Sequence, residues 1–378
     1  MKDFSEVEPN PDLININLGV ASYNVQIGSK LISTLVAELL IDKNQSVVII
    51  DEVVSELIKN RCENFDELNL IEIKAKKESK TLATLTDIIS KIELLNLPRS
   101  TKFIAIGGGI IGDIAGLIAS LWYRGCELIH VPTTLLAAVD SCIGGKTAIN
   151  LNTTINAIGT YYHPSKIIID TDLLKNLPSR ELKSGLAEVI KYSILGNTKI
   201  SGLLKTHDYS ELVKIEKLKE IIKLCLRQKE QFVRGDIKEK SKRLLLNLGH
   251  TIGHAFEINS IVDGTEQLRH GEGVALGITA ISKIAVEVEL LCPNEFQKIR
   301  SLIKKFGLPN TTSAELFSCD RSYLIEKCVN STFNDKKRTT NSLRLILPTS
   351  STGICKIYHT NSKKLIRSGI DFVLENKK

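Results

Sequence analysis

The sequence lacks an uninterrupted apolar run long enough to cross a lipid bilayer. Its longest apolar stretch, near residues 110–122, is broken by Gly112, Asp113 and Gly116, whereas a membrane-spanning helix needs about 20 consecutive apolar residues. The N-terminus is acidic and polar, without the basic and apolar segments of a signal peptide. We therefore expect a soluble, cytoplasmic protein with no membrane partner.

Cysteine pairs with a metal-ligand spacing are also absent. The eight cysteines include no CxxC pair and no regular spacing, so we expect buried free thiols in a reducing compartment. A formal net charge of +7 over 378 residues is modest and the lysines are scattered, which argues against a nucleic-acid partner. Without repeats or low-complexity segments, this length allows two globular domains.

Strand and helix patterns alternate in the N-terminal half of the chain. Short β-branched runs such as residues 47–50 are typical of buried parallel strands. The alternation predicts an α/β domain with an open, mostly parallel sheet over residues 14–176, preceded by a flexible arm over residues 1–13. From residue 177 to 378 we expect a mainly α-helical domain. Its predicted helices span residues 180–195, 214–233, 244–258, 271–291 and 293–306.

The richest stretch for chemistry is residues 104–150. There an apolar run stops at Gly107, Gly108 and Gly109, and a helix of small residues follows. A parallel strand that ends in a glycine turn at a helix N-terminus presents free amide groups and a favourable dipole to a phosphate. The glycines do not form the G-x-G-x-x-G fingerprint, so the pattern predicts a phosphate or pyrophosphate ligand of unspecified kind.

Several single residues allow two interpretations. Asp51 ends a predicted strand and is either a ribose partner or a helix N-cap. Lys80, in a lysine-rich loop, faces either a cofactor phosphate or solvent. Lys146 and Arg243 lie beside glycine-rich or apolar segments, where a solvated cation would be out of place, and so they indicate an anionic substrate.

The second half contains a possible metal site. Glu188 and Lys191 lie three residues apart, and His250 and His254 four apart, so each pair shares a helical face. Glu188 and the histidines, with His270 added, form a set that suits a divalent ion, zinc first. Packing or capping histidines are the alternative, because Thr251 stands where the metalloprotease motif has glutamate.

The chain resembles the 3-dehydroquinate synthase family of sugar-phosphate cyclases from about Asn15 to Gly353. The resemblance is carried by GGGIIGDIAG, YRGCELIHVPTTLLAAVDSCIGGKTAIN, LPSRELKSGLAEVIKY, LLLNLGHTIGHAFE, HGEGVALG and NDKK. It implies an NAD-binding α/β domain, a helical domain, an active site in the cleft between them and a homodimer. It also implies NAD and one divalent metal ion, zinc or cobalt, as cofactors.

The resemblance assigns roles residue by residue. The implied metal ligands are Glu188, His250 and His270. The implied cofactor-binding residues are Asp51, Lys80, Gly108, Gly109, Ile110, Asp113, Thr133, Thr134, Ser141, Leu177 and Glu181. The implied catalytic residues are Lys146, Asp140, Lys191 and His254. The implied substrate-binding residues are Arg124, Asn156, Lys229, Arg243, Asn247 and Lys336, with Lys337 as the alternative to the last.

The implied reaction converts 3-deoxy-D-arabino-heptulosonate 7-phosphate to 3-dehydroquinate and phosphate, a step of the shikimate pathway of aromatic amino-acid biosynthesis. NAD oxidises the substrate transiently, phosphate is eliminated, the hydride returns, and an aldol reaction closes the ring. This chain has Ile155 where the family usually has lysine. Other readings are a related cyclase that makes a valiolone, an inosose or an amino-dehydroquinate, a metal-dependent polyol dehydrogenase, and a non-catalytic binding protein.

Overall fold

The computed structural model describes residues 11–151, 154–263, 265–336, 342–351 and 353–375. These residues form two compact units. The first unit runs to Thr134 and also includes Ser141–Leu151 and Asn156–Asn176. The second unit contains Leu135–Asp140, the described residues 154–155 and the described residues from Leu177 onward. Asp140 therefore belongs with the C-terminal part of the chain.

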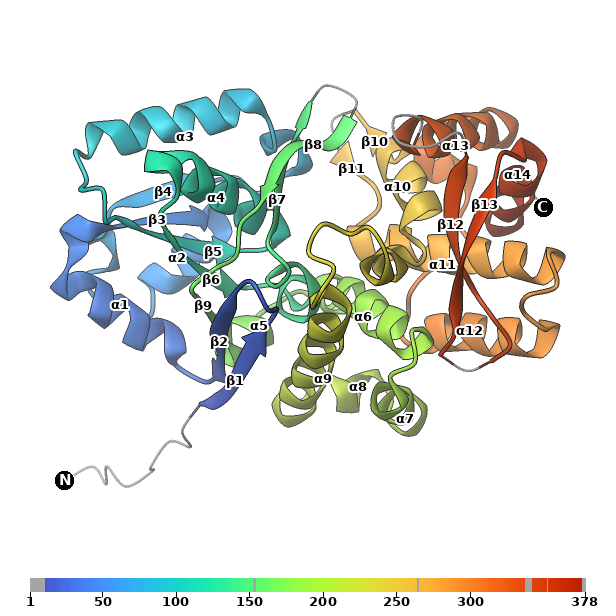
Figure 1. The fold of residues 1–378 in the computed structure, drawn as a ribbon, viewed down its shortest axis with the longest axis horizontal. Coiled ribbons are helices and arrows are strands. Elements are labelled where there is room, and N and C mark those ends of the chain that lie inside the picture. The colour runs from blue at the N-terminus through green and yellow to red at the C-terminus, as the bar shows by residue number, and fades with distance from the viewer. Residues whose placement is uncertain (1–10, 152–153, 264, 337–341, 352, 376–378) are drawn as a thin grey trace. The chain divides into compact units, whose positions relative to one another are not determined.

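The first unit is built on a seven-stranded sheet. Its strands are β1 (Asp12–Asn17), β2 (Ser22–Gly28), β3 (Ser46–Asp51), β4 (Leu70–Ile73), β5 (Lys102–Gly107), β6 (Glu127–Pro132) and β9 (Lys166–Asp170). They lie in the order β1-β2-β9-β6-β5-β3-β4 (Figure 1). Only the pair β1–β2 is antiparallel. The predicted open, mostly parallel sheet is confirmed.

Helices cover both faces of this sheet. They are α1 (Leu31–Ile41), α2 (Glu52–Lys59), α3 (Leu82–Leu94), α4 (Gly109–Leu121) and α5 (Thr171–Lys175). Successive side chains of a strand point to opposite faces. Accordingly, Val47 and Ile49 of β3 pack in the core with α3 and α4, whereas Val48 and Ile50 pack with α1 and α2. Burial on both sides explains the continuous β-branched run.

The sheet topology places Asp51 and the start of the glycine turn at one edge. The chain passes from β3 outward to β4 and then returns to add β5 on the other side of β3. In open α/β sheets, ligands bind beyond the carboxyl ends of the strands at such a reversal. Ile50 pairs with Ile106, so Asp51 and Gly107 end neighbouring strands there.

The sequence patterns did not indicate one hairpin that follows later in the chain. It consists of β7 (Lys146–Leu151) and β8 (Thr154–Tyr161).

The second unit is mainly helical, as expected. Its helices are α6 (Ser179–Ile194), α7 (Thr198–Thr206), α8 (Tyr209–Leu212), α9 (Ile215–Val233), α10 (His250–Asn259), α11 (His270–Glu287), α12 (Pro293–Lys305), α13 (Arg321–Lys336) and α14 (Lys363–Val373). Two small hairpins accompany them: β10 (Ile261–Val262) with β11 (Thr265–Glu266), and β12 (Leu343–Pro348) with β13 (Cys355–Thr360).

One predicted helix, over residues 244–258, is wrong in its first part. A 3₁₀ helix, Lys242–Asn247, comes first, and α10 starts only at His250. Gly249 between them has φ +79°, and a Cβ there would lie 2.9 Å from the carbonyl oxygen of Val274. The left-handed backbone and the close approach of α11 therefore interrupt the helix just before its first histidine.

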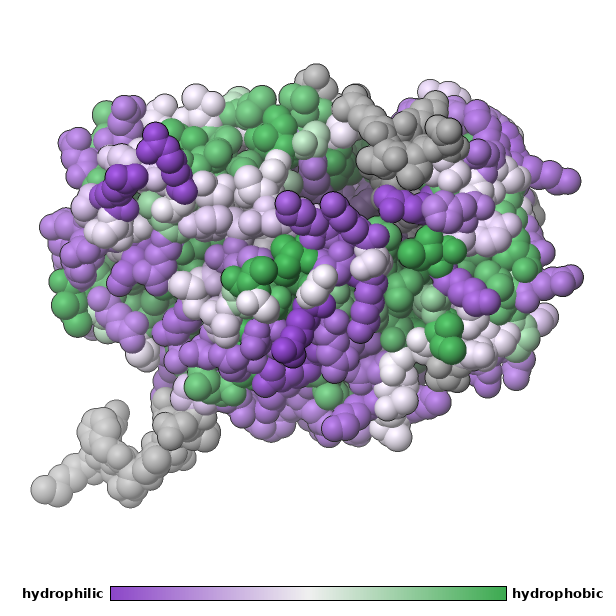
Figure 2. Space-filling view, in the orientation of Figure 1, coloured by the Kyte–Doolittle hydropathy of each residue, from purple (hydrophilic) through white to green (hydrophobic). Residues whose placement is uncertain are grey.

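Three other expectations concern the N-terminal arm, membrane-spanning helices and the cysteines. Of the predicted arm, residues 1–10 lie outside the described residues, whereas Asp12 and Leu13 pair with β2 as part of β1. No described helix combines the length and apolar character needed to cross a membrane. On the face shown in Figure 2, hydrophilic and hydrophobic residues are interspersed. Five of the eight cysteines are buried as expected, but Cys292 is exposed.

Candidate active site

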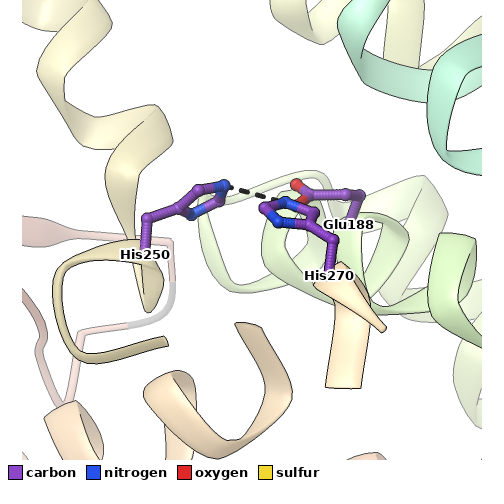
Figure 3. A group of neighbouring side chains, drawn as sticks. All are labelled: Glu188, His250 and His270. Atoms are coloured by element: carbon purple, nitrogen blue, oxygen red, sulfur yellow. Dashed lines mark ion pairs between the residues drawn. The ribbon is translucent and has the colours of Figure 1, made fainter. Parts of the chain in front are cut away.

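Three predicted metal ligands meet in the second unit. Glu188 lies in the buried middle of α6, and His250 and His270 are the first residues of α10 and α11. Figure 3 shows the carboxylate and the two imidazole rings close to one another. Glu188 Oε1 lies 3.4 Å from Nε2 of His250 and 3.5 Å from Nε2 of His270. We call Glu188, His250 and His270 the metal triad.

The geometry of the metal triad fits a small divalent ion. Zinc–ligand bonds of about 2.0–2.1 Å in a tetrahedron separate neighbouring ligand atoms by about 3.3 Å, close to the 3.4 and 3.5 Å found here. One ligand atom of each residue lies within 4.8 Å of the others. The buried carboxylate of Glu188 pairs with Lys191 and also faces both histidines. A carboxylate and two imidazoles are ligands that zinc and similar ions prefer.

Each histidine of the triad is held through its other ring nitrogen. Nδ1 of His250 lies 3.1 Å from the carbonyl oxygen of Leu248, and Nδ1 of His270 lies 3.0 Å from Oε1 of Glu257. A proton on each Nδ1 leaves the Nε2 lone pair for a metal. Sequence reasoning missed Glu257. Its signal is its spacing, because it follows His254 by three residues and shares that face of α10.

The protonation states of two triad members suit metal binding. Burial raises the pKa of Glu188, but Lys191 and His250 outweigh it and lower the pKa to about 2. Burial lowers the pKa of His250 to about 3. For His270 burial also favours the neutral ring, but the nearby carboxylates, Glu257 foremost, raise the pKa to about 10. A metal would therefore displace a proton from His270.

Next to the triad, Asp140 joins two buried lysines. Its Oδ1 lies 3.0 Å from Nζ of Lys229 and 3.7 Å from Nζ of Lys191. The backbone carbonyl of Asp140 also accepts a hydrogen bond from Lys229 at 2.5 Å. Lys191 forms an ion pair with Glu188 as well, so the two groups are continuous. We call Asp140, Lys191 and Lys229 the lysine cluster.

The charges of the lysine cluster compensate one another. Burial raises the pKa of Asp140, but Lys191 and Lys229 outweigh it and hold that pKa well below its usual range. Burial lowers the pKa of Lys191, but Asp140 and Glu188 raise it above the ordinary value. The pKa of Lys229 stays below its ordinary value because of burial, offset only in part by Asp140. Such perturbed groups are typical of functional sites.

Two predicted substrate-binding residues lie on the 3₁₀ helix Lys242–Asn247. Arg243 is almost completely buried, and its Nη1 donates a hydrogen bond to the carbonyl oxygen of Ile237 at 2.6 Å. Asn247 Nδ2 donates to Oε1 of Glu239 at 2.7 Å. Arg243 also contributes to the lowered pKa of Lys229, which places its charge near the lysine cluster.

Of the other predicted catalytic and substrate-binding residues, His254 lies beside the metal triad. The His254 ring centroid lies 5.5 Å from that of His250 and 5.9 Å from that of His270. Arg124 and Lys146 are exposed residues of the first unit, so burial does not distinguish Lys146 from a solvated lysine, contrary to expectation. Lys336 ends α13, and the alternative at residue 337 lies outside the described residues.

The glycine turn after β5 has the predicted strand–turn–helix geometry. Gly108 is the N-cap of α4 and provides no capping side chain. A Cβ on Gly108 would lie 3.2 Å from Thr134 Cγ2, and one on Gly109 would lie 3.2 Å from Ser141 Oγ. The free amide groups of the first helical turn suit a phosphate. The turn groups these predicted cofactor residues: Gly108, Gly109, Ile110, Thr133, Thr134 and Ser141.

Lys80 is buried in an ion pair, which excludes the solvated-loop interpretation. Its Nζ lies 2.6 Å from Oδ2 of Asp113 and donates to Oδ1 of Asn156 at 2.6 Å. Asp113 belongs to the first turns of α4, so Lys80 lies beside the helix that begins at the glycine turn. Asn156, assigned to the substrate by the resemblance, thus lies with two residues assigned to the cofactor.

Two of the remaining predicted cofactor residues, Asp51 and Glu181, have partners in the structure. Asp51 caps α2 by accepting a hydrogen bond from the backbone N–H of Val53 at 3.2 Å, as the capping interpretation predicts. Burial raises the pKa of Asp51. Glu181 lies 2.6 Å from Nε of Arg269. Leu177 is half-buried just before α6.

Comparison with known proteins identifies the family. Family models described as 3-dehydroquinate synthase N-terminal and C-terminal match residues 70–184 and 185–338. A 3-dehydroquinate synthase of Colwellia psychrerythraea strain 34H is 36% identical over 346 residues, which cover 89% of this chain and 94% of that relative. One of Rippkaea orientalis strain PCC 8801 is 38% identical over 352 residues, 89% of this chain and 92% of the relative.

A solved structure extends the comparison to cofactors. The 2-deoxy-scyllo-inosose synthase complexed with carbaglucose-6-phosphate, NAD+ and Co2+ has a TM-score of 0.83 and 27% sequence identity. The match covers 96% of this chain and 100% of that one. The two family models together span more than half of the chain, and the relatives match along most of their length. The chain belongs to the 3-dehydroquinate synthase family.

Proposed function

We propose that the chain is a 3-dehydroquinate synthase that converts 3-deoxy-D-arabino-heptulosonate 7-phosphate to 3-dehydroquinate and phosphate. The proposal rests on one observation: Lys191 connects the metal triad to the lysine cluster. It contacts Glu188 and lies near Asp140. This arrangement brings a metal site and buried cations to one place, as an anionic hydroxylated substrate requires. The relatives named as 3-dehydroquinate synthases support it.

The proposed cofactors are NAD and one divalent ion, zinc or cobalt. The metal triad would hold the ion, and the glycine turn with Lys80 and Asp113 would hold NAD. When bound, NAD supplies a reversible hydride acceptor and the ion a Lewis acid. The solved relative contains NAD+ and Co2+, which agrees with both.

The charged side chains would bind and orient the substrate. Arg243 and Lys229 are buried cations near each other and suit the substrate carboxylate. Lys146 would bind the phosphate. Asp140, held as an anion, suits a substrate hydroxyl, and His254 beside the metal triad would move a proton.

Substrate choice separates this proposal from its alternatives. Arg243 and Lys229 favour a substrate with a carboxylate, which cyclases of neutral-ended sugar phosphates do not need. Phosphate release should be measured with the heptulosonate phosphate, sedoheptulose 7-phosphate and glucose 6-phosphate. We expect turnover of the first alone. Turnover of the carboxylate-free sugars alone would select another cyclase, and net NADH formation from a simple alcohol would select a polyol dehydrogenase.

We also propose that the enzyme acts as a homodimer in the cytoplasm. The support is the resemblance, in which Arg124 matches an arginine that family members lend across the dimer interface, and Arg124 is exposed here. Light scattering after size-exclusion chromatography should give twice the 41.8 kDa mass of the chain. A single-chain mass at micromolar concentration would refute the dimer.

A further inference from the structure

Glu257 is a buried carboxylate that contacts a member of the metal triad. It lies in α10 with only 3% of its surface exposed. Its Oε1 is 3.0 Å from Nδ1 of His270, the first residue of α11. The ring's other nitrogen, Nε2, faces Oε1 of Glu188 at 3.5 Å. The His270 ring therefore lies between two carboxylates, one on each side.

The backbone of α11 leaves room for this contact. A Cβ on Gly273 would lie 2.6 Å from Cγ and 3.0 Å from Oε1 of Glu257. Any side chain at residue 273 would thus push the Glu257 carboxylate away from its place. Since Gly273 comes one helical turn after His270, the same stretch of α11 both presents the imidazole and admits its partner.

The contact favours one tautomer of the His270 ring. A carboxylate oxygen 3.0 Å from Nδ1 favours a proton on that nitrogen, so the proton lost on metal binding is the one on Nε2. The contact also restricts rotation of the ring, so that Nε2 stays directed at the other members of the metal triad. His250 is oriented by the backbone carbonyl of Leu248, so Glu257 is the side chain that performs this task for His270.

We propose that Glu257 is a positioning residue that orients His270 and sets its tautomer for binding the divalent ion. This inference rests on the proposed metal site. Carboxylate–histidine–metal arrangements of this kind typically strengthen metal binding by about 10- to 100-fold. The competing possibility is that Glu257 itself binds an ion together with His254 and Nδ1 of His270, since these three also cluster.

Metal affinity tests the proposal without relying on activity. Zn2+ binding by the full chain should be measured by competition with a chromophoric chelator, together with the Co2+ absorption spectrum. We expect Glu257→Ala to weaken binding of a single ion about 10- to 100-fold and to alter the Co2+ spectrum. Glu257→Gln keeps the size and a neutral acceptor, so its loss should be smaller. Glu287→Gln, an exposed change near the other end of α11, should have no effect.

The outcomes separate this inference from the site on which it rests. Tight binding that is equal in the wild type and Glu257→Ala would overturn the inference alone. Two ions in the wild type and one in Glu257→Ala would also overturn it, because Glu257 would then be a ligand. A wild-type chain that binds no divalent ion would overturn both the metal triad and the inference. Circular dichroism on Glu257→Gln checks that the variant used for comparison is folded.

Discussion

The hydroxyl of Tyr192 donates a hydrogen bond to Oδ1 of Asp140 at 2.5 Å, although the two residues are 52 positions apart in the chain. Tyr192 is completely buried in α6, and its carbonyl oxygen accepts a hydrogen bond from Gln228 at 3.1 Å. A hydrogen bond to an ionised carboxylate stabilises the charged form and restricts its orientation. Tyr192 therefore helps to hold Asp140 between its two lysines.

Removing this hydroxyl should leave the Asp140 carboxylate ionised but less restricted in its orientation. In Tyr192→Phe we expect kcat/KM for phosphate release to fall about tenfold, as the loss of about 1.4 kcal/mol would give. Asp140 should stay ionised at neutral pH, because Lys191 and Lys229 still hold its pKa below the usual range. The pH profile should keep its shape. Tyr209→Phe, an exposed hydroxyl, is the control, and a new titration near neutral pH in Tyr192→Phe would refute this.

Lys191 should contribute most to the free energy of unfolding when no metal is bound. Lys191→Met leaves Glu188 buried without its ion-pair partner, which typically costs about 3–5 kcal/mol. A bound ion would neutralise the same carboxylate, so the loss should shrink in the metal-loaded protein. Urea unfolding of both forms measures this. Lys217→Met, which breaks an exposed pair with Glu220, should cost at most about 0.5 kcal/mol. Equal losses with and without metal would contradict the assignment.

His130 should make the protein less stable in acid. Burial in β6 lowers the pKa of His130 to about 4, against about 6.5 in an unfolded chain. The unfolded state then binds the proton more tightly, so stability is lost as the pH falls through this range, by about 3 kcal/mol at pH 4. His130→Gln should remove this part of the slope. Unfolding free energies at several pH values test it, and parallel curves for both proteins would disprove it.

Gly271 allows α11 to approach α6 closely. A Cβ there would lie 1.9 Å from the carbonyl oxygen of Ser184, and the N–H of Gly271 donates to Ser184 Oγ at 3.0 Å. Gly271→Ala must move His270 away from Glu188, so we expect at least tenfold weaker metal binding and a stability loss of about 1–3 kcal/mol. Gly202→Ala, in open space on α7, should be neutral or stabilising by up to about 1 kcal/mol. Wild-type metal affinity in Gly271→Ala would contradict the packing argument.

Local patterns in the sequence predicted the parts of the site that neighbouring residues determine. The strand, glycine turn and helix around Gly108 depend on consecutive residues, and the spacing of His250 and His254 depends on one helical turn. Both are present in the structure. The α/β and helical halves followed from periodicity in the same way.

Such local patterns could not predict contacts between segments that are far apart in the sequence. Tyr192 and Glu257 serve the site through Asp140 and His270, which lie on other elements. The predicted helix over residues 244–258 was given too early a start for the same reason. The interruption at Gly249 depends on the approach of α11, which is distant in the sequence.

We expect the metal triad and the lysine cluster to support phosphate elimination without net oxidation. The most direct test follows phosphate and NADH together while the metal-loaded enzyme acts on 3-deoxy-D-arabino-heptulosonate 7-phosphate with less NAD than substrate. We predict many phosphate ions released per NAD, no accumulation of NADH, and loss of phosphate release in Glu188→Gln. NADH that accumulates in step with product, or phosphate release that survives Glu188→Gln, would contradict this account.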